Sequence, residues 1–507
     1  MKKTFISLML ATSSVFIYAQ SGTFDTSFNG TGMVLGNYTT GNNSADAMVI
    51  QPDGKIVVSG PTGVSSSVNT GVSRYNTDGT IDTTFGTNGK MSFSSGSGTL
   101  SYLYDMALQT DGKIVMAGYR WNGSAGDFLM ARVNTDGTLD NTFGVNGVAV
   151  FDDANSEVAE SFAINADGSF IVSGYVNDNY TLLKVKSNGT IDTAFGTNGW
   201  VTTPFEGLSA SSKSTSINAA GRIIVGGMGV GAGQSEYVMA AYNPDGTLDN
   251  TFGQGGRINF HIGYDNDFGL QVIQLDNGKI LFGGHSYVGS VPLRYEIAVV
   301  RLNANGSFDN SFGENGIFKS RFFENGRSYL EGMALQSDGK LVATGAANVN
   351  NEENYGLLRI TENGQLDTTF GEDGQVIQKI DNIYAISKNI ALQSDGKIVV
   401  AGDATPFGGG KTQFFIARYN NPVLAVQNVK DATAALYPNP ASDQITLDWN
   451  GSNKTYEIEI YNMVGQKVMT AKVSNKSAIN VSSLEKGNYL LTMKDAGSRK
   501  TIQFIKK

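Results

Sequence analysis

Seven copies of one short motif, spaced at nearly constant intervals, constrain the fold of this chain more than any other feature. The copies are DTSFNGTG at 25, DTTFGTNG at 82, DNTFGVNG at 140, DTAFGTNG at 192, DNTFGQGG at 249, DNSFGENG at 309 and DTTFGEDG at 367. Their phenylalanines are separated by 57, 58, 52, 57, 60 and 58 residues. A period of this length indicates a propeller, a solenoid or an array, because each repeat must bury its apolar face against the next.

A second motif lies about halfway between consecutive copies of the first, and it also occurs seven times, for example as LQTDGKIVMAG from Leu108 and LQSDGKIVVAG from Leu392. Each period holds four short apolar or alternating runs, which in the second period are residues 90–94, 104–109, 113–119 and 128–134. Short runs rich in β-branched and aromatic residues, bounded by Gly, Asn and Asp, predict strands. Four antiparallel strands per repeat predict the blade of a β-propeller.

The two ends of the repeat region complement each other. The last period ends with the strand FFIARYN (414–420) and lacks its DTTFG turn, whereas an unattached copy, FDTSFNGTG (24–32), stands before the first strand. Joined head to tail, the two ends complete the pattern. The sequence therefore predicts an all-β fold with a seven-bladed propeller over residues 20–420. An open β-solenoid is the alternative, although it would need atypical capping repeats.

The N-terminus has the features of an exported protein. Lys2 and Lys3 precede a largely apolar stretch from Phe5 to Tyr18, and Ala19 follows it, which predicts a signal peptide over residues 1–19. No later segment approaches the ~20 apolar residues of a spanning helix, so we expect no membrane span. The absence of cysteine excludes disulfides and thiolate chemistry, and the two histidines, His261 and His285, exclude a His-rich metal centre.

Charge is distributed unevenly along the chain. Residues 435–507 hold 10 basic and 6 acidic residues, whereas residues 20–434 hold 25 basic and 40 acidic residues. An acidic body repels phosphate backbones, so we expect no nucleic-acid partner. We also expect the chain to be a monomer.

The repeated turns separate into a variable half and an invariant half. In the first half, NTDG (76–79), the Asp gives way to Asn in other copies, which suits a turn but would weaken a metal site. In the second half every copy keeps one Asp and one Phe, for which we predict an Asx-turn and a plug between blades. These residues are Asp25, Asp82, Asp140, Asp192, Asp249, Asp309 and Asp367, with Phe28, Phe85, Phe143, Phe195, Phe252, Phe312 and Phe370.

Two further expectations concern these turns. Calcium at the invariant Asp is an alternative to the turn, but the bidentate Glu expected at the twelfth position of a calcium loop is missing, so we predict no cofactor. The Lys that follows the other turn, Lys55 in the first repeat, is interpreted as an exposed charge that discourages edge pairing.

Loops of varied length connect the strands on the face opposite the repeated turns. Such loops on a rigid scaffold are where binding usually occurs, and aromatic side chains there can stack on sugar rings. Packing of the loops on each other is the alternative. The candidate ligand-binding residues are Tyr119, Trp121, Tyr175, Asp178, Tyr264, Tyr287 and Tyr295.

The paired motifs resemble the delta-60 repeat over residues 24–420, which implies a bacterial extracellular repeat protein with no assigned catalytic residues. After a connector at 421–435, alternating strands predict a small C-terminal β-sandwich at 436–507. Its segments LYPNP, YNMVGQKV and LEKGNYLL and the terminal IKK resemble the type A sorting domain of type IX secretion cargo. That resemblance implies a partner, the type IX secretion machinery, and passage through the periplasm to the surface or medium of a Bacteroidota-type bacterium.

The sequence thus predicts an exported, non-enzymatic propeller that binds a glycan or a protein through its variable loops. Two other functions stay open. One is a glycan-active enzyme that uses carboxylates on the variable face, since acidic residues are abundant and their pairing depends on the fold. The other is a structural or adhesive surface protein. No catalytic residue and no metal ligand is assigned.

Overall fold

The computed structural model describes residues 20–64, 67–152, 155–263, 266–290, 293–349, 352–421, 434–449, 455–462, 467–474, 476–495 and 498–507. The predicted signal peptide (1–19) and most of the predicted connector (421–435) lie outside these residues. The chain divides into two compact units, Met1–Val423 and Leu424–Lys507. All elements assigned in the described residues are strands, so the predicted all-β fold is confirmed.

The first unit is built mainly from antiparallel four-stranded meanders, and in most of them the strands are consecutive in the chain. The strands of this unit are β1 (Met33–Gly36), β2 (Asn42–Asn43), β3 (Ala47–Ile50), β4 (Ile56–Val64), β5 (Ser67–Tyr75), β6 (Lys90–Phe93), β7 (Leu100–Leu108), β8 (Ile114–Trp121), β9 (Gly126–Val133), β10 (Val148–Phe151), β11 (Glu157–Ile164), β12 (Phe170–Val176), β13 (Asn179–Val185), β14 (Trp200–Thr203), β15 (Ser209–Ile217), β16 (Ile223–Gly231), β17 (Gln234–Tyr242), β18 (Arg257–Phe260), β19 (Asp267–Gln274), β20 (Ile280–Ser290), β21 (Leu293–Leu302), β22 (Ile317–Ser320), β23 (Arg327–Leu335), β24 (Leu341–Val349), β25 (Glu352–Ile360), β26 (Gln375–Gln378), β27 (Ile383–Leu392), β28 (Ile398–Pro406) and β29 (Gln413–Tyr419).

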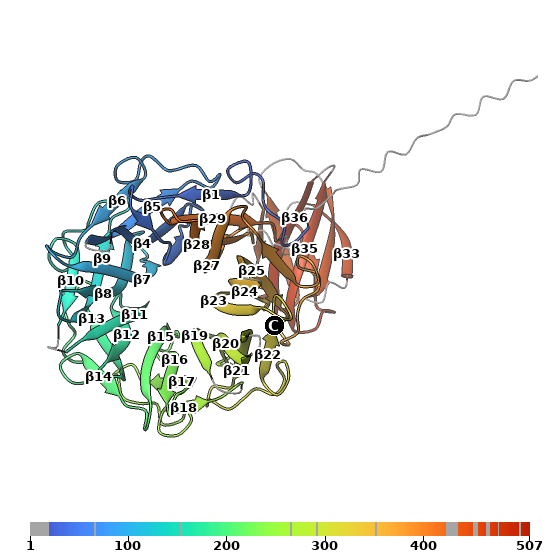
Figure 1. Cartoon of the computed structure of the whole chain (residues 1–507). Coiled ribbons are helices and arrows are strands. Elements are labelled where there is room, and N and C mark those ends of the chain that lie inside the picture. Colours follow the sequence, from blue (N-terminus) through green and yellow to red (C-terminus); the bar gives the residue numbers. More distant parts are fainter. Residues whose placement is uncertain are drawn as a thin grey trace, which may run out of the picture. The chain divides into compact units, whose positions relative to one another are not determined.

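Within a repeat, the order of the strands in the sheet follows the order in the chain. A typical sheet runs β7-β8-β9-β10, and an eight-stranded sheet joins two such meanders, β19 to β22 and β23 to β26, through one parallel bridge between Tyr295 and Arg327. The sheets stand around a central opening, with the first strand of each meander nearest the centre and the last on the outside (Figure 1). This is the arrangement of a β-propeller.

The two ends of the repeat region pair as the sequence predicts. Strand β1 lies antiparallel to β29, with Met33 opposite Ala417 and Gly36 opposite Phe414. The backbone N–H of Asp25 donates to the carbonyl of Arg418 (2.9 Å). The N-terminal segment therefore supplies the outer strand of the sheet that contains β27, β28 and β29, and the open solenoid is excluded.

The second unit has two sheets and one apolar core. Ile445, Ile458, Leu491 and Phe504 are buried in the same cluster although they belong to different sheets. One sheet is β30-β31-β34 and the other β33-β32-β35-β36, formed by β30 (Ala434–Tyr437), β31 (Gln444–Trp449), β32 (Thr455–Asn462), β33 (Lys467–Ser474), β34 (Ala478–Asn480), β35 (Gly487–Asp495) and β36 (Ser498–Lys506). In the described part of the chain no helix has the length and apolar character needed to cross a membrane.

Candidate functional site

The strands nearest the centre of the propeller, here called the inner strands, are β3, β7, β11, β15, β19, β23 and β27. Six of them break register with the next strand at corresponding positions, which leaves one residue unpaired in a β-bulge. Asp46 takes the same place immediately before β3. These residues, here called the bulge residues, are Asp46, Tyr104, Glu160, Lys213, Leu270, Glu331 and Lys388.

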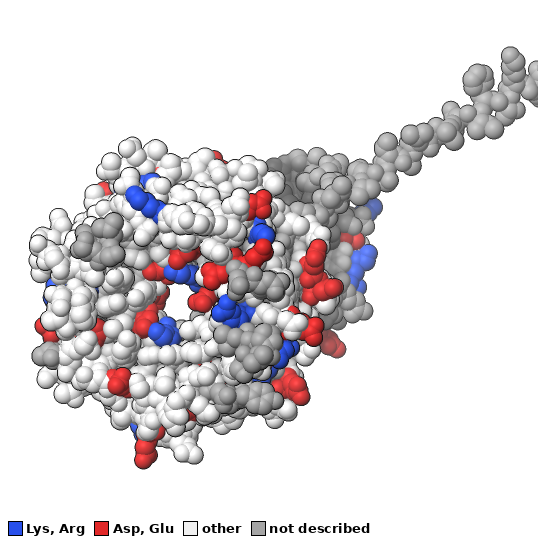
Figure 2. All heavy atoms as spheres, viewed as in Figure 1, with Lys and Arg blue, Asp and Glu red and all other residues white. Residues whose placement is uncertain are grey.

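The bulge residues surround a central cavity of about 420 Å³. Six of them line it directly, together with the residues that follow them on the inner strands, such as Asp105, Gln271 and Asn389. Charged side chains of both signs gather around the central opening in Figure 2. A bulge re-aims a side chain, so one repeated distortion of the backbone supplies a ring of polar groups from strands that otherwise face the apolar core.

Lys388 is fully engaged in this cavity. Its ammonium group lies 2.7 Å from Oδ1 of Asp46 and 2.8 Å from Oδ2 of Asp403, and it donates to Oγ of Ser44 (2.9 Å). Burial alone would lower the pKa of Lys388, but the charges of Asp46 and Asp403 raise it above its usual value. All three N–H groups of this lysine therefore have acceptors within the protein.

Two other carboxyl groups of the cavity also have partners. Oε1 of Glu160 lies 2.5 Å from Nζ of Lys213 on the neighbouring inner strand. Oδ2 of Asp105 accepts hydrogen bonds from Oγ of Ser161 (2.8 Å) and from the backbone N–H of Phe162 (2.9 Å). Burial nonetheless raises the pKa of Asp105 above its usual value.

Glu331 differs from the other acidic groups of the cavity. Among the described residues no side chain or backbone group donates a hydrogen bond to it, and it forms no ion pair. Glu331 is an exposed residue by surface area because it faces the cavity, but protein atoms crowd around its carboxyl group. The resulting loss of solvation raises the pKa of Glu331 to about 7, an effect that the charge of Lys388 opposes. Glu331 is thus a carboxyl group poised near neutrality and free to meet a ligand.

A group of stacked tyrosines adjoins the cavity. The ring of Tyr119 lies 5.2 Å from that of Tyr102 and 5.9 Å from that of Tyr104, measured between centroids, and Tyr104 lines the cavity. We call Tyr102, Tyr104 and Tyr119 the tyrosine stack. Burial and the nearby charge of Glu160 raise the pKa of Tyr175, which places Tyr175 in the same electrostatic environment.

A second aromatic cluster lies on β19 to β23. Tyr287 and Tyr295 are 5.6 Å apart, Tyr295 and Tyr329 are 5.0 Å apart, and His285 packs edge-on to Tyr329 at 4.9 Å. His285 also stacks on Phe268, and its burial lowers its pKa to about 4. The structure thus places Tyr119 in one aromatic group and Tyr287 and Tyr295 in another, on different sheets.

The remaining predicted ligand-binding residues have different surroundings. Trp121 stands at the end of β8 and is 37% exposed. Asp178 lies in the β12–β13 turn, where its Oδ1 accepts from Oγ of Ser209 (2.8 Å), so it holds the neighbouring sheet. Tyr264 lies outside the described residues.

The invariant Asp of the repeated turn uses its two oxygens for two purposes. In Asp82, Oδ1 accepts from the backbone N–H and the hydroxyl of Thr84 (3.1 and 2.6 Å), which holds the turn. Oδ2 lies 2.7 Å from Nε of Arg74 and 2.9 Å from Nζ of Lys55. Burial alone would raise the pKa of Asp82, but these hydrogen bonds and the Arg74 charge hold it well below its usual range. Lys55 is therefore a partly buried member of an ion pair and not the exposed charge that the sequence predicts.

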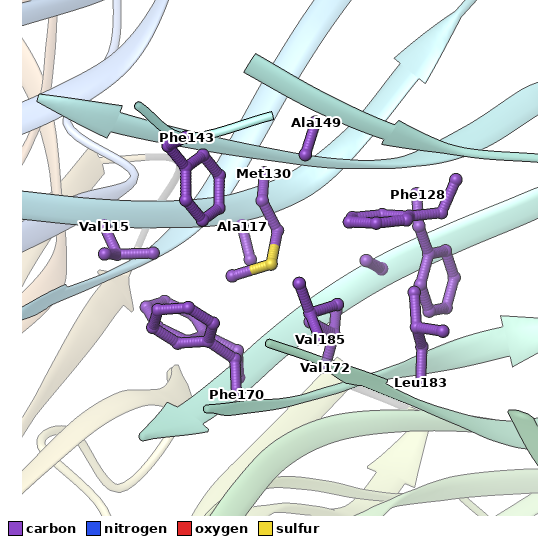
Figure 3. Packing of buried hydrophobic residues seen from close by; sticks show 13 residues of the cluster. Val115, Ala117, Phe128, Met130, Phe143, Ala149, Phe170, Val172, Leu183 and Val185 are labelled. Carbon is purple, nitrogen blue, oxygen red and sulfur yellow. The ribbon is translucent and has the colours of Figure 1, made fainter. Parts of the chain in front are cut away.

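The Arg of this arrangement links one sheet to the next. Arg74 lies over the ring of Phe85, with its guanidinium carbon 4.7 Å from the ring centroid, and its Nη1 donates to the carbonyl of Thr135 (2.6 Å) in the next repeat. We call the Asp, its Phe, the Arg and the Lys the Asp clamp. Figure 3 shows the same Phe in the following repeat, Phe143, packed among side chains of β8, β9, β12 and β13.

The clamp adapts where a partner is missing. Asp140, Asp309, Asp367 and Asp25 each pair with both an Arg and a Lys. Asp249 pairs with Arg222 alone, because Ala241 stands where most other repeats have Arg and one has Lys184. Asp192 has a single partner, Lys184, at 3.5 Å. Because both oxygens of the clamp aspartates face protein donors, we assign these residues to the frame of the propeller.

Sequence reasoning missed the bulge residues. The sequence does hold a usable signal, because several inner strands have a charged residue four positions before their last residue. Examples are Glu331 before Leu335, Glu160 before Ile164 and Lys388 before Leu392. A charged residue in the middle of an apolar strand marks a distortion or a cavity. Among the described residues no three His, Asp or Glu side chains cluster so as to hold a metal ion.

Two protein-family models match parts of the chain. Residues 435–507 match the secretion system C-terminal sorting domain, so the predicted sorting domain is confirmed. Residues 51–85, 109–143, 221–252, 275–312, 336–370 and 393–421 match the β-propeller domain of unknown function DUF5122. A sorting domain of this kind implies handling by the type IX secretion machinery and export to the cell surface or the medium.

Solved structures similar to the chain are distant in sequence. A protein of unknown function from Dyadobacter fermentans DSM 18053 is 10% identical, with a TM-score of 0.42, and the match covers 77% of this chain and 98% of that one. Extracellular domains 1-2 of Drosophila Semaphorin 1b are 9% identical, with a TM-score of 0.39 and coverage of 78% and 87%. The polysaccharide lyase Uly1 is 11% identical, with a TM-score of 0.41 and coverage of 76% and 92%. No curated protein matches the chain. DUF5122 β-propeller repeats and a secretion system C-terminal sorting domain are thus both found in this chain.

Proposed function

We propose that this protein is an exported binding protein that holds a glycan at its central cavity, with the tyrosine stack as the surface for a sugar ring. The observation that carries the proposal is the combination, in one cavity of about 420 Å³, of an aromatic side chain, Tyr104, with a carboxyl group that has no protein partner, Glu331. Binding sites of roughly 300–1,000 Å³ typically pair apolar or aromatic walls with a few unpaired polar groups.

The surrounding frame supports this function because it is rigid. The Asp clamps link neighbouring sheets, and side chains of the inner strands add further links, such as Ser214 to the backbone N–H of Val272 (3.1 Å). A rigid frame holds a binding site in place before the ligand arrives, which lowers the entropy lost on binding. The sorting domain would deliver this site to the cell surface or the medium, where it can meet polysaccharides.

A glycan array probed with purified residues 20–507 tests the proposal. We expect retention on at least one polysaccharide and its loss in Tyr104→Ala, since an aromatic face is removed from the cavity wall. Trp121→Ala tests whether the variable loops contribute to binding in addition to the cavity. Val145→Ala, at a residue 77% exposed in an outer turn, is the control that should bind normally. A folded chain that retains no glycan would contradict the proposal.

A glycan-active enzyme is the second candidate, and the raised pKa of Glu331 favours it, because general acids have pKa values near neutrality. Two-carboxylate sugar chemistry needs a second free carboxylate, however. Asp46 and Glu160 are both held by lysines, so binding is the better supported function. Release of reducing sugar ends from a bound polysaccharide, and its loss in Glu331→Gln, would reverse this order.

A further inference from the structure

In the described part of the chain, several polar side chains of the central cavity are already paired with other groups of the protein, whereas the carboxyl group of Glu331 is not. The three N–H groups of Lys388 donate to Asp46, Asp403 and Ser44. The side-chain amide of Gln271 is used on both sides, since its Nε2 donates to the carbonyl of Met333 and its Oε1 accepts from the N–H of Met333. The carboxyl group of Glu331 has no donor among the described residues. A ligand group that pairs with the ionised carboxylate of Glu331 must therefore bring a donor.

Asn389 extends the free acceptor surface. Its Nδ2 donates to the carbonyl of Ala45 (3.0 Å), and its Oδ1 receives no hydrogen bond from the described residues. Asn389 follows Lys388 on β27, the inner strand next to the one that carries Glu331. Both residues line the cavity, so a ligand that enters it meets two unsatisfied oxygens.

The charge of the cavity favours a cation. Five carboxyl groups, those of Asp46, Asp105, Glu160, Glu331 and Asp403, lie in or beside it, and the ammonium groups there are those of Lys213 and Lys388. Acidic groups focused in a cleft with low-dielectric walls attract positive charge. Because Glu331 is the carboxyl group without a partner, it is the place where an incoming cation gains most.

Local packing explains why Glu331 has no protein partner. The residue after the bulge bonds across to the next inner strand in several repeats, as Asp105, Ser214 and Asn389 do, whereas the residue after Glu331 is Gly332. A Cβ at Gly332 would lie 3.2 Å from Cγ2 of Ile390 and 3.2 Å from the carbonyl oxygen of Lys388, so the strands approach closely there. On the other side the neighbouring bulge residue is the apolar Leu270, which cannot donate.

We propose that the central cavity binds a protonated primary amine on the glycan ligand, that of an amino-sugar unit, with Glu331 as its counter-ion and Asn389 as a second acceptor. The inference rests on the proposed glycan-binding function and names the class of its ligand. The ammonium group donates to Glu331, and hydroxyl groups of the same sugar donate to the remaining acceptors. An N-acetylated sugar lacks the charge and is disfavoured.

Isothermal titration calorimetry of purified residues 20–507 in neutral buffer of low ionic strength tests this inference. The probes are a β-1,4-linked glucosamine hexamer and the N-acetylglucosamine hexamer of the same linkage. We expect the free amine to bind at least about tenfold more tightly, as a charge-assisted hydrogen bond predicts. Glu331→Gln, which keeps the size of the side chain, should remove most of this preference, whereas Glu372→Gln, the same change of charge in an outer turn, should keep it.

The outcomes distinguish this inference from the function on which it rests. Equal affinity for the two hexamers, or an amine preference that survives in Glu331→Gln, overturns the amine site but leaves glycan binding intact. Absence of binding to both hexamers and to every polysaccharide of the array overturns both. Tighter binding of pentalysine than of the glucosamine hexamer overturns the assignment of the amine to a sugar.

Discussion

At the scale of single residues, the repeated Asp carries out two tasks that the sequence shows as one invariant letter. Its Oδ1 shapes a turn, which Asn could also do, and its Oδ2 balances two cations, which Asn could not. This second task explains why no repeat replaces Asp25, Asp82 or their counterparts. Removing the charge would leave a buried guanidinium without its partner.

We therefore predict that Asp82→Asn destabilises the propeller by roughly 3 kcal/mol, because Arg74 and Lys55 both lose their counter-ion and Asp82 is only 4% exposed. Asp192→Asn is the matched control, since Asp192 is 22% exposed and has one partner at 3.5 Å, and it should cost clearly less. Urea unfolding followed by tryptophan fluorescence measures both. Equal losses for the two variants would contradict the clamp.

The clamp also sets the response to acid. Asp25 has a pKa lowered from 3.8 to about 2, since the bonds from Ser27 and Lys397 and the charge of Arg418 outweigh the burial that would raise it. A lowered pKa stabilises the fold above the unfolded value, and that contribution is lost as pH falls through the folded value. The chain should thus lose stability between about pH 4 and pH 2. Asp25→Asn should show a shallower loss over that window.

The pKa shift of Glu331 has the opposite sign to that of Asp25, so its effect on stability depends on pH in the opposite direction. Burial raises its pKa from 4.5 to about 7, so the folded chain holds a proton that the unfolded chain releases, and stability falls as pH rises through this window. We predict that Glu331→Gln has a higher melting temperature than the wild type at about pH 8 and that the two converge near about pH 4. Glu372→Gln should follow the wild type throughout. A pH-independent difference would mean that Glu331 does not titrate in this range.

At the scale of elements, each repeat is fitted to the next by a turn that leaves no room for a side chain. Gly137 has a φ of 85°, and a Cβ there would lie 2.5 Å from the backbone nitrogen of Gly86 and 3.0 Å from the ring of Phe85. The same contact carries a hydrogen bond, because the N–H of Gly86 donates to the carbonyl of Asp136 (2.7 Å). The turn is therefore part of the interface between sheets.

Gly137→Ala should consequently destabilise the propeller by roughly 2–4 kcal/mol, since it adds a backbone clash to the strain of a positive φ. Gly123→Ala separates the two effects, because Gly123 has a φ of 98° and nothing within 4 Å of its Cβ position, so it should cost about 1 kcal/mol. Thermal melts of the two variants measure the difference. Similar melting temperatures would show that the interface between sheets accommodates the added methyl group without a loss of stability.

Most of the strands and turns could be predicted from the sequence, because their patterns are local and occur many times over. The pairing of β1 with β29 also followed, since the turn missing after residue 420 was visible at residue 24. The central cavity could not be predicted from the sequence. Glu331 and Lys388 belong to it through β-bulges, and a bulge depends on how two strands pair rather than on which residues they contain. The ion pair of Lys55 cannot be predicted for a similar reason, because its partner Asp82 lies 27 residues away in the sequence.

At the scale of the whole molecule, the two units have separate tasks. We predict that deletion of residues 436–507 leaves the propeller in the periplasm, because the sorting domain directs the final step of export. Cell fractionation and protease shaving of intact cells measure the location. Tyr104→Ala in the full chain is the control and should reach the surface normally. Surface delivery of the deleted chain would contradict the assignment.

The pairing of β1 with β29 has a consequence for how this protein comes into being. Asp25 finds Arg418 and Lys397 only after nearly the whole repeat region has been made, and Arg359 bonds Asn421 and Ser21, which come from opposite ends of that region. Throughout synthesis the first strand stays without its neighbour, and the growing chain keeps an open edge at each end. Only a chain of full length can complete the ring, because a chain that stops early keeps both strand edges exposed and open to pairing with other chains.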